Sequence, residues 1–400
     1  MKMSLLLACL AMTTWTMVFG NVVDGGEGKT ILVFGGNGFV GGSTAELLME
    51  RGNNVIMVNR GNWYWDSKNR ILPHVRHIKC DRDLKLEDCT ELIEVIKDTD
   101  QFDAVIDFSA FGMNPVKEST AALADKCKIY ILFSSDTVYD FCEKVSTGPT
   151  LETDAVRHQD ADEVERRRHY HIRGFNKMEA EEALMQQRVD GGFPFVILRL
   201  PDILGPRDTT FRFWLYQLWI KLSKVIKDKP VLVPEFLDNY KMSFIYSEDI
   251  PKAFVKILNM GPQINDQAIN LAYPEAHTLV ELIRDIQEAL GVTEDSFQVQ
   301  ERNTSDHAYY YPTARRGPIS VEKAENLLSW QPTPWDEMVK TTVEFYEDAM
   351  VNEVFKHQRD EIIQIMGHQA FKDDLHELYN ALEELYKIEL NHFKIVKDEL

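Results

Sequence analysis

Short apolar runs and amphipathic stretches alternate along the first half of the chain. The run Thr30–Phe34 is rich in β-branched and aromatic residues, a composition typical of a buried parallel strand. Glycines at 35, 38 and 41 come next, and the pattern predicts a helix over residues 39–51 and a second strand over residues 54–60. A strand, a glycine-rich turn, a helix and a strand within roughly 30 residues form a βαβ unit.

The same alternation continues to about residue 200. We predict further strands over residues 74–80, 104–108, 129–133 and 195–199, and a helix over residues 174–187. Residues 140–171 are polar and charged, include the run Arg166 to Arg168, and are predicted to form a long surface loop. The predicted fold is therefore α/β, with a doubly wound parallel Rossmann sheet over residues 28–200.

The rest of the chain is less regular. We expect a tryptophan-containing helix over residues 210–226, short strands near Val231 and Phe244, and helices near Asp249, Thr278 and Ser320. Residues 201–347 are accordingly predicted to form a smaller C-terminal substrate lobe interleaved with the Rossmann core. No internal repeat of fixed period is present.

Residues 348–400 form a predicted helical tail. Apolar residues recur in it at spacings of three and four, with charged residues between them, which indicates an amphipathic helix: Phe371, Leu375, Leu378, Leu382 and Leu385. Such an apolar face either packs on its own domain or meets a second copy of the chain, so a homodimer is one interpretation.

Both ends carry targeting patterns. Residues 1–20 begin with a lysine, continue with an apolar run and end on small residues, as a signal peptide does. No other stretch is apolar for the roughly 20 residues that a membrane span needs. The last four residues, Lys397 to Leu400, read KDEL, the address by which a receptor retrieves proteins to the endoplasmic reticulum. Together these ends predict a protein of the endoplasmic reticulum lumen.

Composition and charge limit the possible functions and the possible compartment of the protein. The formal net charge of −20 argues against nonspecific nucleic-acid binding, which depends on lysine and arginine. Asn303 begins a glycosylation acceptor sequence, in keeping with a lumenal protein. After signal cleavage four cysteines remain, which allow three fully paired connectivities: Cys80, Cys89, Cys127 and Cys142. We expect four free, mostly buried thiols, because a core of this size does not need covalent support.

The glycine turn has the composition of a dinucleotide site. Gly35 permits a sharp turn, Gly38 leaves room for a pyrophosphate, and Gly41 lets the helix pack closely on the strand. The phosphates would lie at the N-terminus of that helix, beside Phe39 and Val40, where free N–H groups and the helix dipole favour negative charge.

Other positions refine the choice of cofactor. Asp81, after the third strand, is expected to face the adenine, and Ser109 follows the fourth strand at the edge where ligands bind. The second strand ends in Arg60 without an acidic residue for the ribose hydroxyls. Arg60 suits a 2′-phosphate and so favours NADP, with NAD as the alternative if Arg60 only stacks on the adenine.

From about Thr30 to Glu347 the chain resembles the extended short-chain dehydrogenase/reductase family, in particular its NAD-dependent epimerase/dehydratase type. The resemblance rests on the glycine turn and on later segments in the same order: residues 134–139 (SSDTVY), 198–199 with 205–207, 244–250 (FIYSEDI) and 323–332. It implies that Ser135 is the catalytic hydroxyl that binds the substrate oxygen. It also implies that Lys177 holds the cofactor ribose.

The resemblance breaks one helical turn before Lys177. Family members carry a proton-exchanging tyrosine four residues before this lysine, whereas this chain has Arg173. An arginine stays protonated and has donors but no acceptor, so it cannot replace a tyrosine in acid–base catalysis. Tyr170 is an alternative source of the hydroxyl. Arg173 either pairs with a nearby acid or binds a carboxylate or phosphate of a substrate, together with Arg207, Arg315 or Arg316.

Two functions follow. The first is a lumenal NAD(P)-binding protein of the epimerase/dehydratase type that acts on a sugar or nucleotide sugar with altered catalysis, its site including Ser135, Arg173 and Lys177. The second is a noncatalytic NAD(P)-binding sensor or scaffold. Relatives that lack the tyrosine include RNA-binding proteins, but the charge and the lumenal address argue against that role. His158, His169 and His171 are predicted to bind no metal.

Overall fold

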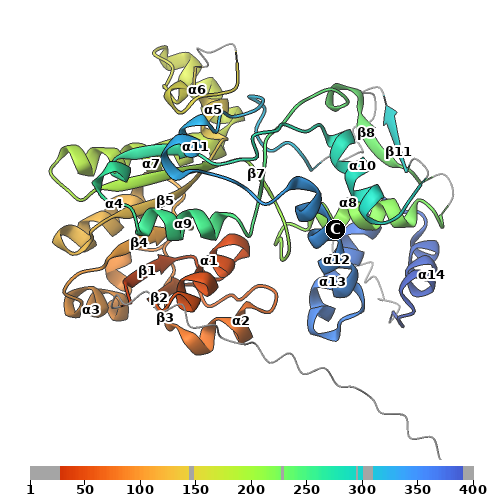
Figure 1. Ribbon diagram of the computed structural model, residues 1–400, viewed down its shortest axis with the longest axis horizontal. Helices are drawn as coiled ribbons and strands as arrows, with labels where there is room; N and C mark the ends of the chain where they lie inside the picture. The colour runs from red at the N-terminus through yellow and green to blue at the C-terminus, as the bar shows by residue number, and fades with distance from the viewer. Residues whose placement is uncertain (1–27, 144–147, 227–228, 294–295, 301–309, 391–400) are drawn as a thin grey trace, which may run out of the picture.

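The computed structural model describes residues 28–143, 148–226, 229–293, 296–300 and 310–390 (Figure 1). The predicted signal peptide, the acceptor residue Asn303 and the C-terminal KDEL sequence lie outside these ranges. Within them, no helix combines the length and the apolar character that crossing a membrane requires.

A central sheet of seven parallel strands organises the first half of the molecule. Its order is β10-β6-β5-β4-β1-β2-β3. The strands are β1 (Thr30–Phe34), β2 (Asn54–Asn59), β3 (Arg76–Lys79), β4 (Ala104–Asp107), β5 (Tyr130–Ser135), β6 (Phe195–Leu200) and β10 (Gln267–Asn270). The chain reverses its direction of travel across the sheet between β1 and β4, and ligands bind at the carboxyl ends of strands at such a point.

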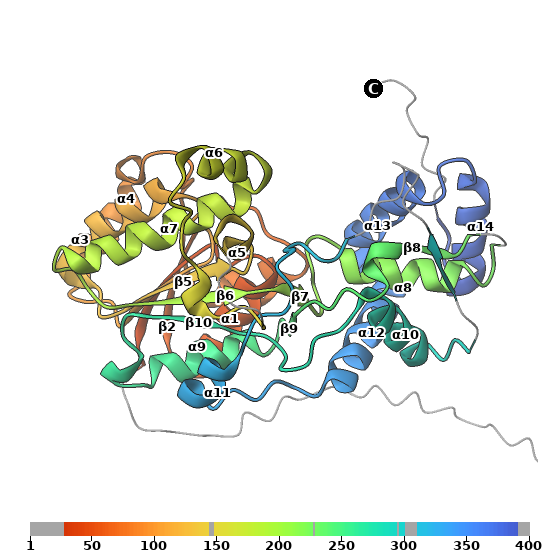
Figure 2. The ribbon, with the colours of Figure 1, turned by 90° about the horizontal axis from the view of Figure 1, so that it is seen from above.

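Helices cover both faces of this sheet (Figure 2). One layer contains α3 (Thr90–Asp98), α4 (Met113–Leu123) and α7 (Ile172–Val189), and the other contains α1 (Phe39–Glu50), α9 (Ile250–Leu258) and α11 (Glu322–Leu328). Because side chains alternate along a strand, Leu32 and Phe34 enter the core under the first layer, and Ile31 and Val33 enter the core under the second. The predicted doubly wound Rossmann sheet is confirmed.

A second lobe extends to one side of the sheet. One apolar core holds its elements together: α8 (Arg212–Leu222), β8 (Val231–Pro234), α10 (Leu279–Ala289), α12 (Trp335–Val351), α13 (Lys356–Gln369) and α14 (Leu375–Tyr386). β11 (Phe297–Gln300) pairs with β8, and β7 (Asp202–Leu204) pairs with β9 (Phe244–Tyr246). Leu378 and Leu382 of the tail are fully buried in this core, so the apolar face of α14 packs on its own lobe.

The segment predicted as a long loop contains helical structure. It includes α5 (Val138–Phe141) and α6 (Ala161–Tyr170), so the loop prediction for residues 140–171 is wrong over α6. The side chain of Asp160 caps α6 by accepting from the N–H groups of Asp162 and Glu163. Glu163 pairs with Arg167 one turn later. Local polar interactions therefore form this helix without an apolar face.

The remaining elements are short. They are α2 (Ser67–Arg70) and 3-10 turns at Leu72–His74, Leu86–Asp88, Ala124–Lys126, Glu152–Asp154, Glu235–Leu237, Pro262–Ile264 and Glu353–Phe355.

The expectation of four free thiols is also wrong. Cys80 and Cys89 form a disulfide between the end of β3 and the start of α3, whereas Cys127 and Cys142 are free and buried. Burial raises the pKa of each free thiol to about 12, which makes both poor nucleophiles. The disulfide closes a short loop that carries the predicted adenine-facing residue Asp81.

Candidate active site

The glycine turn has the geometry that its sequence predicts. Gly35 has a φ of +79°, and its N–H donates to the carbonyl of Val58 at 2.9 Å. A Cβ on Gly41 would lie 2.7 Å from the carbonyl oxygen of Gly35, so only glycine lets α1 pack this closely. A Cβ on Gly38 would meet nothing within 4 Å. Open space therefore lies before the N-terminus of α1, where a pyrophosphate would bind.

The two residues after Gly38 contribute backbone rather than side chains to this space. Phe39 is half-buried and Val40 is buried, and both belong to the apolar core between α1 and the sheet. Their N–H groups are at the first turn of α1, as an anion site requires.

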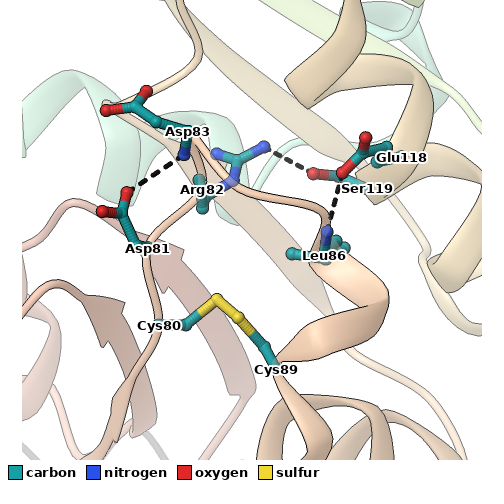
Figure 3. The surroundings of a disulfide bond; sticks show 8 residues. All are labelled: Cys80, Asp81, Arg82, Asp83, Leu86, Cys89, Glu118 and Ser119. Carbon is teal, nitrogen blue, oxygen red and sulfur yellow. Dashed lines mark hydrogen bonds between the residues drawn. A yellow bond between two sulfur atoms is a disulfide. The ribbon is translucent and has the colours of Figure 1, made fainter.

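The loop after β3 carries Arg82, whose side chain points toward Ser119 of α4 (Figure 3). Its Nη1 atom donates to both carboxylate oxygens of Asp107 at 2.7 Å, and its Nη2 atom donates to Ser119 and to the carbonyl of Pro115. The guanidinium also lies 4.0 Å from the ring centroid of Phe34. Burial by itself would raise the pKa of Asp107, but the Arg82 charge outweighs it and lowers that pKa. Sequence reasoning missed Arg82, although Asp81 beside it was predicted.

Asp81 begins this loop, and Arg60 follows β2, the strand that pairs with β3. The carboxylate of Asp81 accepts from the N–H of Asp83 at 3.1 Å, and Leu86 donates to Glu118 at 2.8 Å (Figure 3). Arg60 is exposed after β2 and its guanidinium lies 3.3 Å from the Asp83 carboxylate. Exposed pairs of this kind contribute little to stability, so Arg60 is free to contact a ligand instead.

A cavity of about 320 Å³ lies at the carboxyl edge of the sheet. Its walls come from the ends of β4, β5 and β6, from α7 and from the second lobe, and they include Ser109, Ser135, Asp136, Arg173, Lys177, Asp202 and Arg212. The structure thus brings together the predicted residues Ser109, Ser135, Arg173 and Lys177. A larger hollow of about 640 Å³ beside Trp330 and Trp335 contains none of the predicted site residues.

Lys177 is held firmly on the wall of this cavity. Its Nζ atom donates to the carbonyl of Ala110 at 3.0 Å and to that of Phe133 at 2.8 Å. Burial lowers the pKa of Lys177 to about 8, and the charge of Arg173 acts in the same direction. Gly174 allows this approach of α7, because a Cβ there would lie 2.1 Å from the carbonyl oxygen of Thr137.

Ser135 has a carboxyl neighbour that sequence reasoning did not select. Ser135 Oγ lies 3.3 Å from Asp136 Oδ1 and accepts from the hydroxyl of Thr137 at 3.1 Å. Burial, followed by the charges of Asp202 and Asp140, raises the pKa of Asp136 well above its ordinary value. A buried carboxyl with a raised pKa therefore lies beside the predicted catalytic hydroxyl. Its place in the 134–139 motif was the available signal.

The other predicted arginines do not join this cavity. Arg207 binds Asp66 with two bonds of 2.8 and 3.0 Å, and Arg316 donates to the carbonyl of Cys142 at 2.7 Å. Neither lines the cavity with Arg173, so the structure does not bring the predicted arginine set together. Tyr170 ends α6 and is 72% exposed, outside the cavity lining. Among the described residues no group of three or more His, Cys, Asp or Glu side chains is placed to bind a metal.

The sheet order, the glycine turn and the cavity define a Rossmann protein with a dinucleotide site. A model of the NAD dependent epimerase/dehydratase family matches residues 31–272. The chain belongs to this family.

Known proteins that match 80–82% of the chain agree with this assignment. Human dTDP-D-glucose 4,6-dehydratase is 21% identical over 352 residues, which cover 82% of this chain and 93% of that protein. The UDP-glucose 4-epimerase of Thermotoga maritima, solved with UDP-glucose, superposes with a TM-score of 0.60 at 20% identity, covering 80% of this chain and 99% of that one.

A UDP-glucuronic acid 4-epimerase from Bacillus cereus, solved with NAD, gives a TM-score of 0.60 at 18% identity and covers 80% of this chain and 99% of that one. At these identities the structural likeness shows the fold.

Proposed function

We propose that the protein is an NAD(P)-binding epimerase/dehydratase-type enzyme of the endoplasmic reticulum lumen that acts on a sugar or nucleotide sugar with altered catalysis. The observation that carries the proposal is the 320 Å³ cavity, in which Ser135, Asp136 and Lys177 face the same space as Arg173. Relatives named for nucleotide sugars support the substrate class.

The residues present fit a nicotinamide dinucleotide. The space before α1 at Gly38 would take the pyrophosphate, Asp81 would face the adenine, and Lys177 would hold the ribose next to the nicotinamide. When bound, that cofactor supplies hydride transfer.

The chain's own groups supply hydrogen bonds and protons around a substrate. Ser135 donates to a substrate oxygen, and the Asp136 carboxyl beside it, whose pKa burial raises, is the group that would exchange a proton. Arg173 has no acceptor, so the proton exchange that the family assigns to tyrosine has no equivalent at this position. That difference is the altered catalysis.

The test is a turnover assay on purified residues 21–400 with NAD or NADP and a panel that includes UDP-glucose, UDP-glucuronic acid and dTDP-glucose. We expect a change in nicotinamide absorbance or a new sugar product with at least one of them. An Asp136→Asn variant keeps the shape of the side chain and removes its acid proton, so its rate should fall by about 10²–10⁴-fold. Wild-type chain that binds cofactor and converts none of the panel contradicts the proposal.

Cofactor choice is proposed to depend on Arg60. A charged hydrogen bond to a 2′-phosphate contributes about 1.5–3 kcal/mol, so Arg60 should favour NADP over NAD by roughly tenfold or more. Similar solved structures bind NAD. Titration of both cofactors into wild type and Arg60→Ala distinguishes the cases: a preference for NADP that Arg60→Ala removes supports the proposal, and equal binding of both cofactors by wild type contradicts it.

The lumenal location is proposed from the two terminal sequences. Deleting Lys397 to Leu400 should convert a retained protein into a secreted one, since the retrieval receptor reads this address. Retention that does not change on deletion contradicts the proposal.

The noncatalytic sensor or scaffold is the second candidate, and Arg173 favours it. It predicts tight cofactor binding without conversion of any sugar in the panel. Cofactor affinity and turnover, measured on the same preparation, separate the two functions.

A further inference from the structure

We infer that Arg173 selects a substrate whose reacting sugar carries a carboxylate, that is, an acidic nucleotide sugar. The inference rests on the proposed function and adds to it the substrate class that this arginine recognises.

The surroundings of Arg173 differ from those of neighbouring arginines. Three of them bind carboxylates of this chain: Arg157 contacts Glu182, Arg199 contacts Glu181 and Arg212 contacts Asp202. Within the described ranges no carboxylate lies within ion-pair distance of Arg173, although the chain has a net charge of −20. Its side chain is exposed and lines the cavity. The sequence leaves two roles for Arg173: pairing with a nearby acid, or binding an anionic group of a substrate. The structure does not show the first.

The cavity has an excess of positive charge. Asp202 is already bound by Arg212 at 2.5 Å and by the N–H of Thr313 at 2.7 Å, which leaves that pair neutral. The lining then has Arg173 and Lys177 against the single carboxyl of Asp136, and burial raises the pKa of that carboxyl, which disfavours its negative charge. Among the described residues, neither Arg173 nor Lys177 has a carboxylate at ion-pair distance, and after burial the charge of Arg173 also lowers the pKa of Lys177. A negatively charged substrate group would neutralise both.

The position of Arg173 identifies which part of a nucleotide sugar carries that charge. Arg173 and Lys177 are four residues apart on α7, about one turn or roughly 6 Å along the helix axis. An anion bound by Arg173 therefore lies within a sugar ring's width of the nicotinamide end that Lys177 would hold. The diphosphate is attached at the anomeric carbon C1, whereas the carboxylate of a uronic acid is attached at C5, which is bonded to C4 and separated from C1 by the ring oxygen. The arginine fork binds such a carboxylate with two parallel hydrogen bonds.

The experiment compares UDP-glucuronic acid with UDP-glucose, which share the diphosphate and differ in the carboxylate. Affinities are measured by calorimetry with saturating cofactor for wild type, Arg173→Gln and Arg166→Gln. Arg166 is a matched control, since it is exposed on α6 and pairs with Glu163. We expect wild type and Arg166→Gln to bind UDP-glucuronic acid about tenfold or more tightly than UDP-glucose.

In Arg173→Gln the preference should disappear through weaker binding of UDP-glucuronic acid alone. Equal affinities in wild type overturn the inference while leaving the proposed function intact. An equal loss of affinity for both ligands in Arg173→Gln indicates that Arg173 binds the diphosphate. That result also overturns the inference. Binding of neither UDP sugar by wild type overturns the inference, and turnover of dTDP-glucose then decides whether the proposed function falls with it.

Discussion

The glycine turn follows the carboxyl end of β1, and the start of α7 lines the cavity at the carboxyl ends of β4, β5 and β6. The two regions differ in how far they keep what their motifs predict. At the turn, Gly35 and Gly41 permit close backbone approach and Gly38 leaves space, and all three act as the sequence predicts. At α7, Gly174 and Lys177 keep the close packing and the carbonyl contacts, but the residue one turn earlier is Arg173. The geometry that binds a dinucleotide can therefore persist where the group expected to move a proton does not.

Replacing Arg173 by tyrosine should remove the difference between the two regions. With Lys177 one turn away, a tyrosine hydroxyl could exchange a proton with a neutral sugar, so we expect conversion of UDP-glucose to rise by about 10²–10⁴-fold. Single-turnover absorbance of the nicotinamide measures the rate. Arg173→Phe is the control because it lacks only the hydroxyl. Equal rates in the two variants would show that position 173 does not reach the reacting sugar.

A substitution of Lys177 tests the part of α7 that keeps the close packing and the carbonyl contacts. Its pKa is lowered to about 8, so between pH 8 and its ordinary value of 10.5 the unfolded chain binds a proton that the folded chain has lost. The free energy of unfolding then rises with pH across this window, by on the order of 3 kcal/mol in total. Below pH 8 both states are protonated and burial of the charge is destabilising.

Lys177→Met should lack this rise, and denaturant unfolding at several pH values measures it. Lys340→Met is the control, since Lys340 is exposed on α12. Parallel pH curves for wild type and Lys177→Met would contradict the lowered pKa.

Breaking the disulfide tests the side of the dinucleotide site that is proposed to face the adenine. Cys80 and Cys89 are nine residues apart, and a loop of this size is stabilised by about 2.5 kcal/mol in the chain-entropy description. Cys89→Ser should lower the melting temperature and weaken cofactor binding, because Asp81 and Arg82 lie within the closed loop. Dithiothreitol should have the same effect on wild type and none on the variant. Unchanged cofactor affinity in both cases would separate the disulfide from the site.

The glycine turn itself predicts two different alanine effects, and overpacking at Gly41 should cost about 1–3 kcal/mol of stability. Gly41→Ala places a Cβ against the backbone of Gly35 and should lower stability. Gly38→Ala meets nothing in the protein and should fold normally, yet lose cofactor affinity because its methyl group occupies the pyrophosphate space. Melting curves with and without cofactor report both effects. Normal cofactor binding by Gly38→Ala would place the pyrophosphate elsewhere.

Local structure explains most of what was predicted correctly. The strands and the glycine turn depend on residues that are neighbours in the sequence. The strands form from apolar runs that become buried, and the turn forms from glycines that allow a positive φ and close backbone contact. The helix α6 was missed because apolar periodicity was the criterion, whereas a cap at Asp160 and the charge pair between Glu163 and Arg167 form it. Its acidic first turn and basic last turn were visible in the sequence.

The sequence by itself determined the Rossmann order of elements, the dinucleotide turn and the residue that stands one turn before Lys177, because each depends on residues close together in the chain. Tertiary structure decided the rest. It paired Cys80 with Cys89, bound Arg207 to Asp66, and buried Asp136 near Asp202, 66 positions later. It also left Arg173 lining a cavity in which no described carboxylate lies within ion-pair distance of it. Ion pairing, burial and pKa depend on distances between segments remote in sequence, which local patterns do not specify.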